Sequence, residues 1–154
     1  MTDADARVNG ENRIPVTMTL PEIQAQLIED LAVLPSPTER LTVIMERAGQ
    51  VELPETSRIE EYRVEGCVSM VWVLPELRNS CCFFQSDADS HLVRGLVHLL
   101  CDLYSGHAPE VIITTKFELI DRLGLDRQLS PSRLQGLRAV HAEIIAFAQQ
   151  CLEL

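Results

Sequence analysis

Apolar residues recur every three or four positions in two early stretches of the chain, which begin at residues 19–22 and 36–39. Each start has a threonine or serine with a glutamate three positions later. In such a capping box the hydroxyl accepts a free backbone N–H and the glutamate binds back to the backbone of the cap residue. The pattern therefore predicts two helices, the first ending before Pro35 and the second at Gly49, joined as a helical hairpin.

The pattern changes to β-type between residues 59 and 86. Segments 59–65, 68–74 and 81–86 are rich in β-branched, aromatic and other apolar residues, and Gly66 and the polar segment 75–80 separate them. These features predict two or three antiparallel strands. Both faces of segment 68–74 are largely apolar, so we expect helices to cover at least one face of the sheet.

Helical spacing returns in the C-terminal part of the chain. Asp87 and Asp89 precede a broad apolar stripe that ends at Gly106, and we expect both carboxylates to lie at the electropositive start of that helix. A shorter helix is predicted over residues 114–124, and Ser130 with the following proline opens a long last helix. Strands clustered between helices indicate an α+β domain with helices packed on an antiparallel sheet.

Composition narrows the functional classes. The chain has 154 residues, of which 46% are hydrophobic and 23% charged, as in a globular protein. Residues 1–14 lack apolar periodicity and are predicted to form a mobile arm, and residues 15–154 a single domain. The net charge of −10 opposes binding to nucleic acid. The sequence shows no apolar run long enough to span a bilayer and no targeting segment, so we expect no membrane partner and a cytoplasmic location.

The five cysteines form an odd set without a CxxC pair or zinc-like spacing, so we predict neither a disulfide framework nor a metal site. Cys81 and Cys82 are neighbours in a predicted strand, point to opposite faces, and read as packing residues. Cys67 differs, because Gly66 before it tolerates a positive φ and so favours a tight turn. That turn would place the thiol at a hairpin tip. The other interpretation is a continuous strand with Cys67 buried in it.

The surroundings of Cys67 in sequence offer little activation. A cysteine nucleophile needs a base or a cation nearby to form the thiolate. Arg63 and Glu65 roughly cancel, and the histidines show no pairing with Cys67. A hydrolase of the Cys-His kind is therefore disfavoured.

Three blocks of residues carry a resemblance to a known family. The first is Arg-Val-x-Gly-Cys-x-Ser-x-Val-Trp at residues 63–72. The second is Asp-x-Asp with Gly-Leu six residues later, at residues 87–96, and the third is Leu-Ser-Pro-Ser-Arg-x-x-Gly-Leu at residues 129–137. In this order the chain resembles the SufE family of cysteine desulfurase activators, which includes the CsdE proteins. The family usually has glutamines where this chain has Val68 and Met70.

The resemblance implies a SufE/IscU-like fold, with a three-stranded antiparallel sheet and helices packed against it. It implies a sulfur-transfer accessory protein rather than a stand-alone enzyme. Such a protein takes persulfide sulfur from a SufS/CsdA-like cysteine desulfurase onto Cys67, stimulates that enzyme, and delivers sulfur for iron–sulfur cluster assembly on a SufBCD-like scaffold. The pyridoxal phosphate (PLP) resides on the partner, and no cofactor is expected here. The residues implied in partner binding or loop support are Gly66, Arg63, Arg133, Asp87 and Asp89.

Two other classes of function stay open from the residues. A scaffold that assembles the cluster itself needs several converging ligands, and the chain offers one loop cysteine. A binding module could switch on the desulfurase without carrying sulfur. Chemically, a persulfide relay needs one thiolate to attack the outer sulfur held by another, so the acceptor has to reach into the partner's active site.

Overall fold

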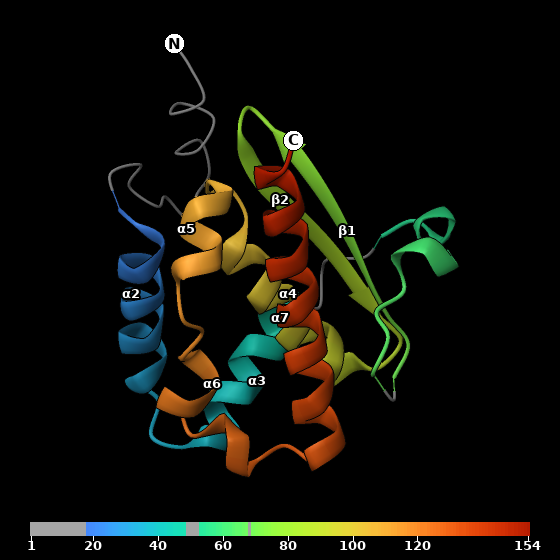
Figure 1. The fold of residues 1–154 in the computed structure, drawn as a ribbon. Coiled ribbons are helices and arrows are strands. Elements are labelled where there is room, and N and C mark those ends of the chain that lie inside the picture. The colour runs from blue at the N-terminus through green and yellow to red at the C-terminus, as the bar shows by residue number, and fades with distance from the viewer. Residues whose placement is uncertain (1–17, 49–52, 68) are drawn as a thin grey trace.

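A β-hairpin and the helices around it form the computed structural model, which describes residues 18–48, 53–67 and 69–154 (Figure 1). Strands β1 (Val71–Arg78) and β2 (Cys81–Ala88) pair antiparallel, from Val71 opposite Ala88 to Arg78 opposite Cys81. The two residues between them, Asn79 and Ser80, have φ of 51° and 66°. Positive φ at both positions is the requirement of a tight two-residue hairpin turn. The predicted arm, residues 1–14, lies outside the described residues.

The first two helices begin where the capping boxes predict. Helix α2 (Leu20–Ala32) starts after Thr19, whose hydroxyl accepts the Glu22 backbone N–H at 3.3 Å, while the Glu22 carboxylate accepts the Thr19 N–H at 2.8 Å. Helix α3 (Pro37–Ala48) starts after Ser36, whose hydroxyl accepts a backbone N–H from Glu39. The predicted helical hairpin is confirmed.

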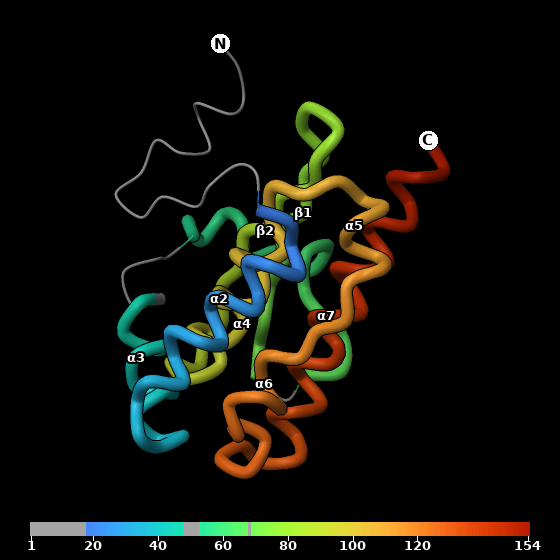
Figure 2. The backbone as a smooth tube through the Cα atoms, turned by 90° about the vertical axis from the view of Figure 1, so that its left-hand side faces the viewer, coloured from blue at the N-terminus to red at the C-terminus, as the bar shows by residue number. Residues whose placement is uncertain are grey.

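The remaining elements complete the described fold. They are the 3₁₀ turns η1 (Glu55–Ser57), η2 (Glu60–Tyr62) and η3 (Leu125–Arg127), and the helices α4 (His91–Tyr104), α5 (Pro109–Thr114), α6 (Leu119–Arg122) and α7 (Pro131–Leu152). Helix α4 packs on β2, and it lies between α3 and α7 (Figure 2). Helix α7 opens after Ser130, which caps it as predicted. Among the described residues, no helix is both long and apolar enough to cross a bilayer.

The prediction of a three-stranded sheet is wrong, because the described residues form only two strands. In segment 59–65 the N–H groups of Tyr62 and Arg63 bond locally to the carbonyls of Ile59 and Glu60, which makes a 3₁₀ turn. Only one bridge, Arg63 to Trp72, joins this segment to the outer edge of β1. Pro75 lies in β1 and has no N–H to donate, which suits an edge strand.

The helix predicted over residues 114–124 is mostly replaced by a loop. Only Leu119–Arg122 is helical there, and α5 forms just before it. The buried side chain of Gln24 accepts the N–H groups of Glu118 and Leu119 and donates to the carbonyl of Lys116. A side chain more than ninety residues away in sequence thus satisfies backbone groups that a longer helix would have paired.

Candidate functional site

Cys67 lies directly after a tight turn between η2 and β1. Gly66 in that turn has φ of 90°, a conformation that side-chain-bearing residues rarely adopt. The Val64 N–H donates to the Val71 carbonyl at 2.9 Å, so the chain folds back on itself around the turn. The turn that the sequence predicts at Gly66 is present, and Cys67 is not part of a continuous strand.

Helix α7 approaches this turn very closely at a glycine. A Cβ on Gly136 would lie 3.5 Å from the Cys67 sulfur, and a Cβ on Gly66 would lie 3.5 Å from that of Ala139. The Cys67 thiol donates a long, weak hydrogen bond to the Gly136 carbonyl, with 3.6 Å between sulfur and oxygen. Small residues on this face of α7 therefore let the loop rest against the helix with the thiol half-buried.

The thiol opens into a cavity of ≈ 260 Å³ between the loop, α4 and the first turns of α7. The cavity is lined by Cys67, Ser69, Val93, Ser130, Ser132, Arg133 and Gly136. Arg133 is exposed, and its backbone N–H donates to the capping hydroxyl of Ser130 at 3.3 Å. The structure thus brings Arg133 and Cys67 to the same cavity, and the role of Arg133 stays a prediction.

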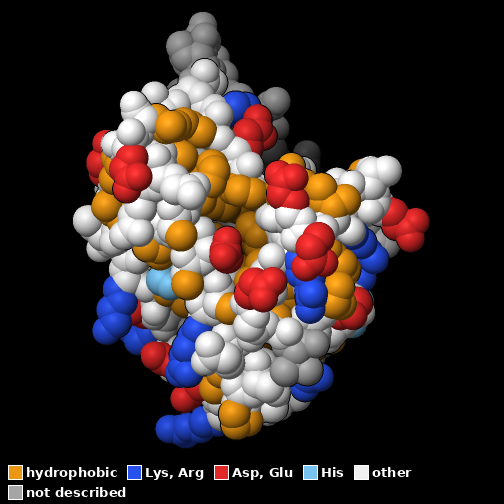
Figure 3. Space-filling model, turned by 45° about the vertical axis from the view of Figure 1, so that its right-hand side comes forward, with side chains coloured by type: hydrophobic (Ala, Val, Ile, Leu, Met, Phe, Trp, Pro, Cys, Tyr) orange, Lys and Arg blue, Asp and Glu red, His pale blue; other side chains and the backbone are white. Residues whose placement is uncertain are grey.

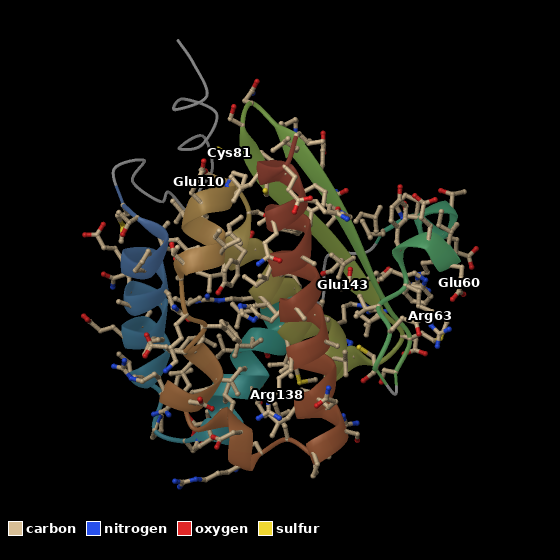
Figure 4. All side chains as sticks on the ribbon, in the orientation of Figure 1. Glu60, Arg63, Cys81, Glu110, Arg138 and Glu143 are labelled. Carbon is tan, nitrogen blue, oxygen red and sulfur yellow. The ribbon has the colours of Figure 1, made fainter. Side chains whose placement is uncertain are left out.

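The electrostatics around Cys67 keep its thiol protonated at rest. Burial raises the pKa of the Cys67 thiol, and the positive charge of Arg63 opposes that effect only in part. Arg63 also forms an ion pair with Glu60, whose carboxylate lies 3.4 Å from the guanidinium (Figure 4). Of the described residues that line the cavity, none is a histidine or a carboxylate. The cavity therefore supplies no general base for the thiol.

Asp87 lies elsewhere than the sequence predicts, inside the structure at the end of β2 rather than at a helix start. Its carboxylate is fully buried and paired with Arg58 at 2.8 Å and with Arg94 at 3.0 Å. It also accepts the backbone N–H groups of Leu53 and Ala88. This buried ion-pair cluster ties the segment that leads to Cys67 onto β2 and α4.

The pKa of Asp87 reflects those contacts. Burial by itself raises it, but the hydrogen bonds from Arg58, Ala88 and Leu53 outweigh burial and leave the pKa below its usual value. Arg58 also lies over the Trp72 ring, with 5.2 Å between the guanidinium carbon and the ring centroid. Asp87 thus remains a charged anchor and does not line the cavity.

Asp89 is exposed and holds the other end of the Cys67 loop. Its carboxylate accepts the Met70 N–H at 3.2 Å, and its own N–H donates to the Met70 carbonyl at 3.1 Å. The α4 cap is instead Ser90, which accepts from Val93. The loop is thus fixed by the Gly66 turn on one side and by Asp89 on the other. Val68 lies outside the described residues.

The sequence did not predict several contacts that shape this region. Arg58 and Arg94 complete the Asp87 cluster, and Gly136 makes room for the thiol. A glycine inside a long amphipathic helix is a signal of close approach by another element, so Gly136 was detectable. The arginines carried no such signal, because their partner, Asp87, was expected at a helix start.

The face that carries the 53–67 segment has a mixed character. Acidic side chains gather there around an apolar hollow, and most of the visible Lys and Arg side chains lie below them (Figure 3). In the part of the chain that the structure describes, no group of three or more His, Cys, Asp or Glu side chains is placed to hold a metal ion.

A family comparison covers most of the chain. The SufE family model, described as an Fe-S metabolism associated domain, matches residues 25–148. An uncharacterized SufE-like protein of Rhizobium meliloti is 32% identical over 130 residues, covering 80% of this chain and 93% of that protein. The sulfur acceptor protein CsdE of Escherichia coli is 35% identical over 100 residues, covering 64% of this chain and 68% of CsdE.

The fold also has a solved counterpart. The solution structure of a hypothetical protein from Thermus thermophilus matches with a TM-score of 0.72 and 24% identity. The match covers 89% of this chain and 100% of that one. The likeness shows a shared fold, in which helices pack on an antiparallel hairpin.

Proposed function

We propose, because this chain belongs to the SufE family, that it is a sulfur acceptor in iron–sulfur metabolism. In this proposal Cys67 takes the sulfane sulfur of a persulfide held by a PLP-dependent cysteine desulfurase. The single observation that supports this most strongly is the position of Cys67, at a glycine turn and open to a cavity on the surface. The similarity to a relative named as a sulfur acceptor, CsdE, points the same way.

The transfer is a thiol exchange that needs no oxidant. The Cys67 thiolate attacks the outer sulfur of the partner's persulfide, a new S–S bond forms on Cys67, and the partner's cysteine leaves as a thiolate. No electron is gained or lost by the pair of proteins as a whole. Since burial raises the pKa of the resting Cys67 thiol, we expect the base that takes its proton to come from the desulfurase.

Delivery requires the thiol to leave its resting place against α7. Among the described residues, one weak hydrogen bond, to the Gly136 carbonyl, holds the sulfur there. The loop that carries it is short and begins at Gly66, whose backbone freedom suits a hinge. An outward swing of this loop would present the thiol to a partner's active site while the Asp87 cluster keeps the preceding segment in place.

The proposed partners follow from the same step. A SufS/CsdA-like desulfurase supplies the sulfur and carries the PLP, and a SufBCD-like scaffold receives it for cluster assembly. The protein acts as an accessory that stimulates the desulfurase. We place the exchange in the cytoplasm. The five cysteines are all free, and the cytoplasm is a compartment that keeps thiols reduced.

The experiment is peptide mass mapping after incubation with a cysteine desulfurase and free cysteine. The proposal expects one added sulfur atom on the Cys67 peptide, removed again by a thiol reductant, and no desulfurase stimulation by Cys67→Ser. Cys81→Ser is the matched control, because Cys81 is also half-buried and free but lies at the hairpin tip. Full stimulation by Cys67→Ser would overturn the proposal.

Two outcomes would favour other functions. Stimulation with Cys67 unmodified would point to a binding module that activates the desulfurase without carrying sulfur. A coloured protein after anaerobic reconstitution with iron and sulfide would point to a cluster scaffold, since bound clusters absorb visible light and need several protein ligands.

A further inference from the structure

A pair of thiols lies near the far end of α7 from Cys67. Cys82 lies in β2 and is fully buried, and Cys151 lies in the last turn of α7 and is half-buried. Figure 4 labels the neighbouring Cys81 beside the C-terminal end of α7, well away from Arg63. The proposed sulfur relay uses neither Cys82 nor Cys151.

The register of β2 against α7 brings these two cysteines together. Phe84 of β2 and Phe147 of α7 meet edge to face, with 5.8 Å between ring centroids. Cys82 is two residues before Phe84 and so shares its face of the strand. Cys151 is four residues after Phe147 and so shares its side of the helix. Two strand residues and one helical turn cover similar distances, so the cysteines oppose each other just as the phenylalanines do.

The electrostatics agree with this placement, because Cys151 is near enough to raise the pKa of the Cys82 thiol. Cys81 belongs to the other face of β2 and lies opposite Arg78 in the hairpin. Cys82 is next to Cys81 in sequence, but in the fold its side chain faces Cys151 instead.

We propose that Cys82 and Cys151 form an oxidant-sensitive dithiol site, which a hydroperoxide converts to a disulfide between β2 and the end of α7. The half-buried Cys151 sulfur, as thiolate, attacks an oxygen of the peroxide, the O–O bond breaks, and Cys151 becomes a sulfenic acid. The Cys82 sulfur then attacks that sulfur, the S–S bond forms, and the S–O bond breaks with loss of water. Two thiols lose two electrons and two protons, and hydrogen peroxide is reduced to two waters.

The environment explains the order of the two steps. Burial first, and then the neighbouring Cys151, raise the pKa of the Cys82 thiol to about 12. Cys82 is therefore protonated at neutral pH and is not the thiol that reacts first with the peroxide. Cys151 is the residue that solvent reaches, so oxidation enters there.

The disulfide would close a covalent link between the hairpin and the C-terminal turn of α7. Cys67 would stay free, because it lies against the opposite end of that helix, near Gly136. The inference is independent of the proposed sulfur relay. It assigns to this end of the molecule a reversible modification that a dithiol reductant removes.

The test uses the full chain carrying Cys67→Ser, so that the loop thiol does not react. After a small excess of hydrogen peroxide and alkylation of remaining thiols, the proposal expects loss of two hydrogens from the intact mass and one linked peptide pair containing Cys82 and Cys151. The melting temperature rises, and dithiothreitol reverses both changes.

Variants keep the proposal open to refutation. Cys151→Ser, at a half-buried position, should abolish the linked peptides, and so should Cys82→Ala if that buried change leaves the protein folded. Cys81→Ser is the control and should form the link as well as its parent. Oxidation of Cys151 to sulfinic acid without a link, a Cys81–Cys82 bond, or no reaction would each overturn the inference.

Discussion

Helix α7 holds a cysteine of another element near each of its ends, and the two regions differ in what surrounds the sulfur. Near the start, Gly136 and Ala139 face the Cys67 loop, and a cavity of ≈ 260 Å³ lies beside the thiol. Near the end, Phe147 packs on β2 and Cys82 is fully buried. The first region has small residues and open space beside the sulfur. The second has large apolar side chains, and the Cys82 side chain is not exposed to solvent.

The contacts that fix the two regions differ as well. The Cys67 loop is tied by polar side chains, the buried Asp87 cluster and the exposed Asp89. The Cys82 region is tied by apolar packing and by backbone hydrogen bonds, since the Cys82 N–H donates to the His107 carbonyl at 2.9 Å. The exposed contacts of Asp89 exchange readily with water, so the end of the Cys67 loop that they hold opens at lower free energy than a core strand. This difference suits the proposed transfer of sulfur by the Cys67 loop and a core around Cys82 that stays closed.

The largest effect that tests this comparison is expected from Asp87→Ala. Removing the carboxylate leaves the partly buried Arg58 and Arg94 without their shared partner, so the free energy of unfolding should fall by about 3–5 kcal/mol. Urea denaturation measures the loss. The pKa of Asp87 is lower in the folded protein than its value of 3.8 in the unfolded chain, so the wild type loses this stabilisation as the pH falls below 3.8. The difference in unfolding free energy between wild type and Asp87→Ala should therefore shrink at low pH.

Asp89→Ala is the matched control for this change. It removes one exposed hydrogen bond to Met70, and the expected loss is only about 0.5–1.5 kcal/mol. Equal losses for the two variants would mean that the buried cluster does not anchor the segment before Cys67.

Gly66→Ala should have the next largest effect. An alanine at φ of 90° is strained, so the variant should lose about 1–2 kcal/mol of stability in urea denaturation. Gly66→Asn should lose less, because asparagine tolerates positive φ better than alanine. A Gly66→Ala protein as stable as the wild type would show that the turn does not need glycine.

Gly136→Ala should act in the opposite direction. The new Cβ of residue 136 would lie 3.5 Å from the Cys67 sulfur and 3.8 Å from the Cys67 Cβ, and both are ordinary contact distances. Alanine is also more favourable than glycine inside a helix. The expected gain is about 0.5–1 kcal/mol in the same denaturation measurement. Loss of stability would indicate that the loop needs more room beside α7 than the resting structure shows.

The smallest effect is expected from Arg63→Gln, measured as the alkylation rate of the Cys67 peptide against pH. Arg63 lowers the pKa that burial has raised, so its removal raises the pKa further and shifts the rate profile to higher pH. Because Arg63 is partly exposed and screened, the rate at neutral pH should fall by only about two-fold. Arg133→Gln is the control, and a profile that moves equally with both variants would contradict the specific influence of Arg63.

Local chemistry made much of this arrangement predictable. The capping boxes at Thr19 and Ser36, the cap at Ser130 and the turn at Gly66 each depend on residues within a few positions of one another. Such signals are complete in the sequence, so the helix starts and the turn before Cys67 follow from it. Gly136 gave a weaker signal, since it marks a close approach without naming what approaches.

What could not be predicted depends on contacts between distant residues. Segment 59–65 has strand-like composition, but local 3₁₀ bonds and the edge position of β1 leave it with a single bridge. After residue 114, part of the predicted helix is a loop, because the Gln24 side chain forms hydrogen bonds with the backbone there. Asp87 was expected at a helix start because its two arginine partners, Arg58 and Arg94, become neighbours only in the fold.

The most direct test of the account is a single-turnover transfer. A cysteine desulfurase is loaded with ³⁵S-labelled cysteine, freed of excess substrate and mixed with this protein. The account predicts that reductant-labile label moves to the wild type and is recovered on the Cys67 peptide, with none on Cys67→Ser. Label that stays on the desulfurase, or that reaches the Cys67→Ser protein at the same rate, would contradict it.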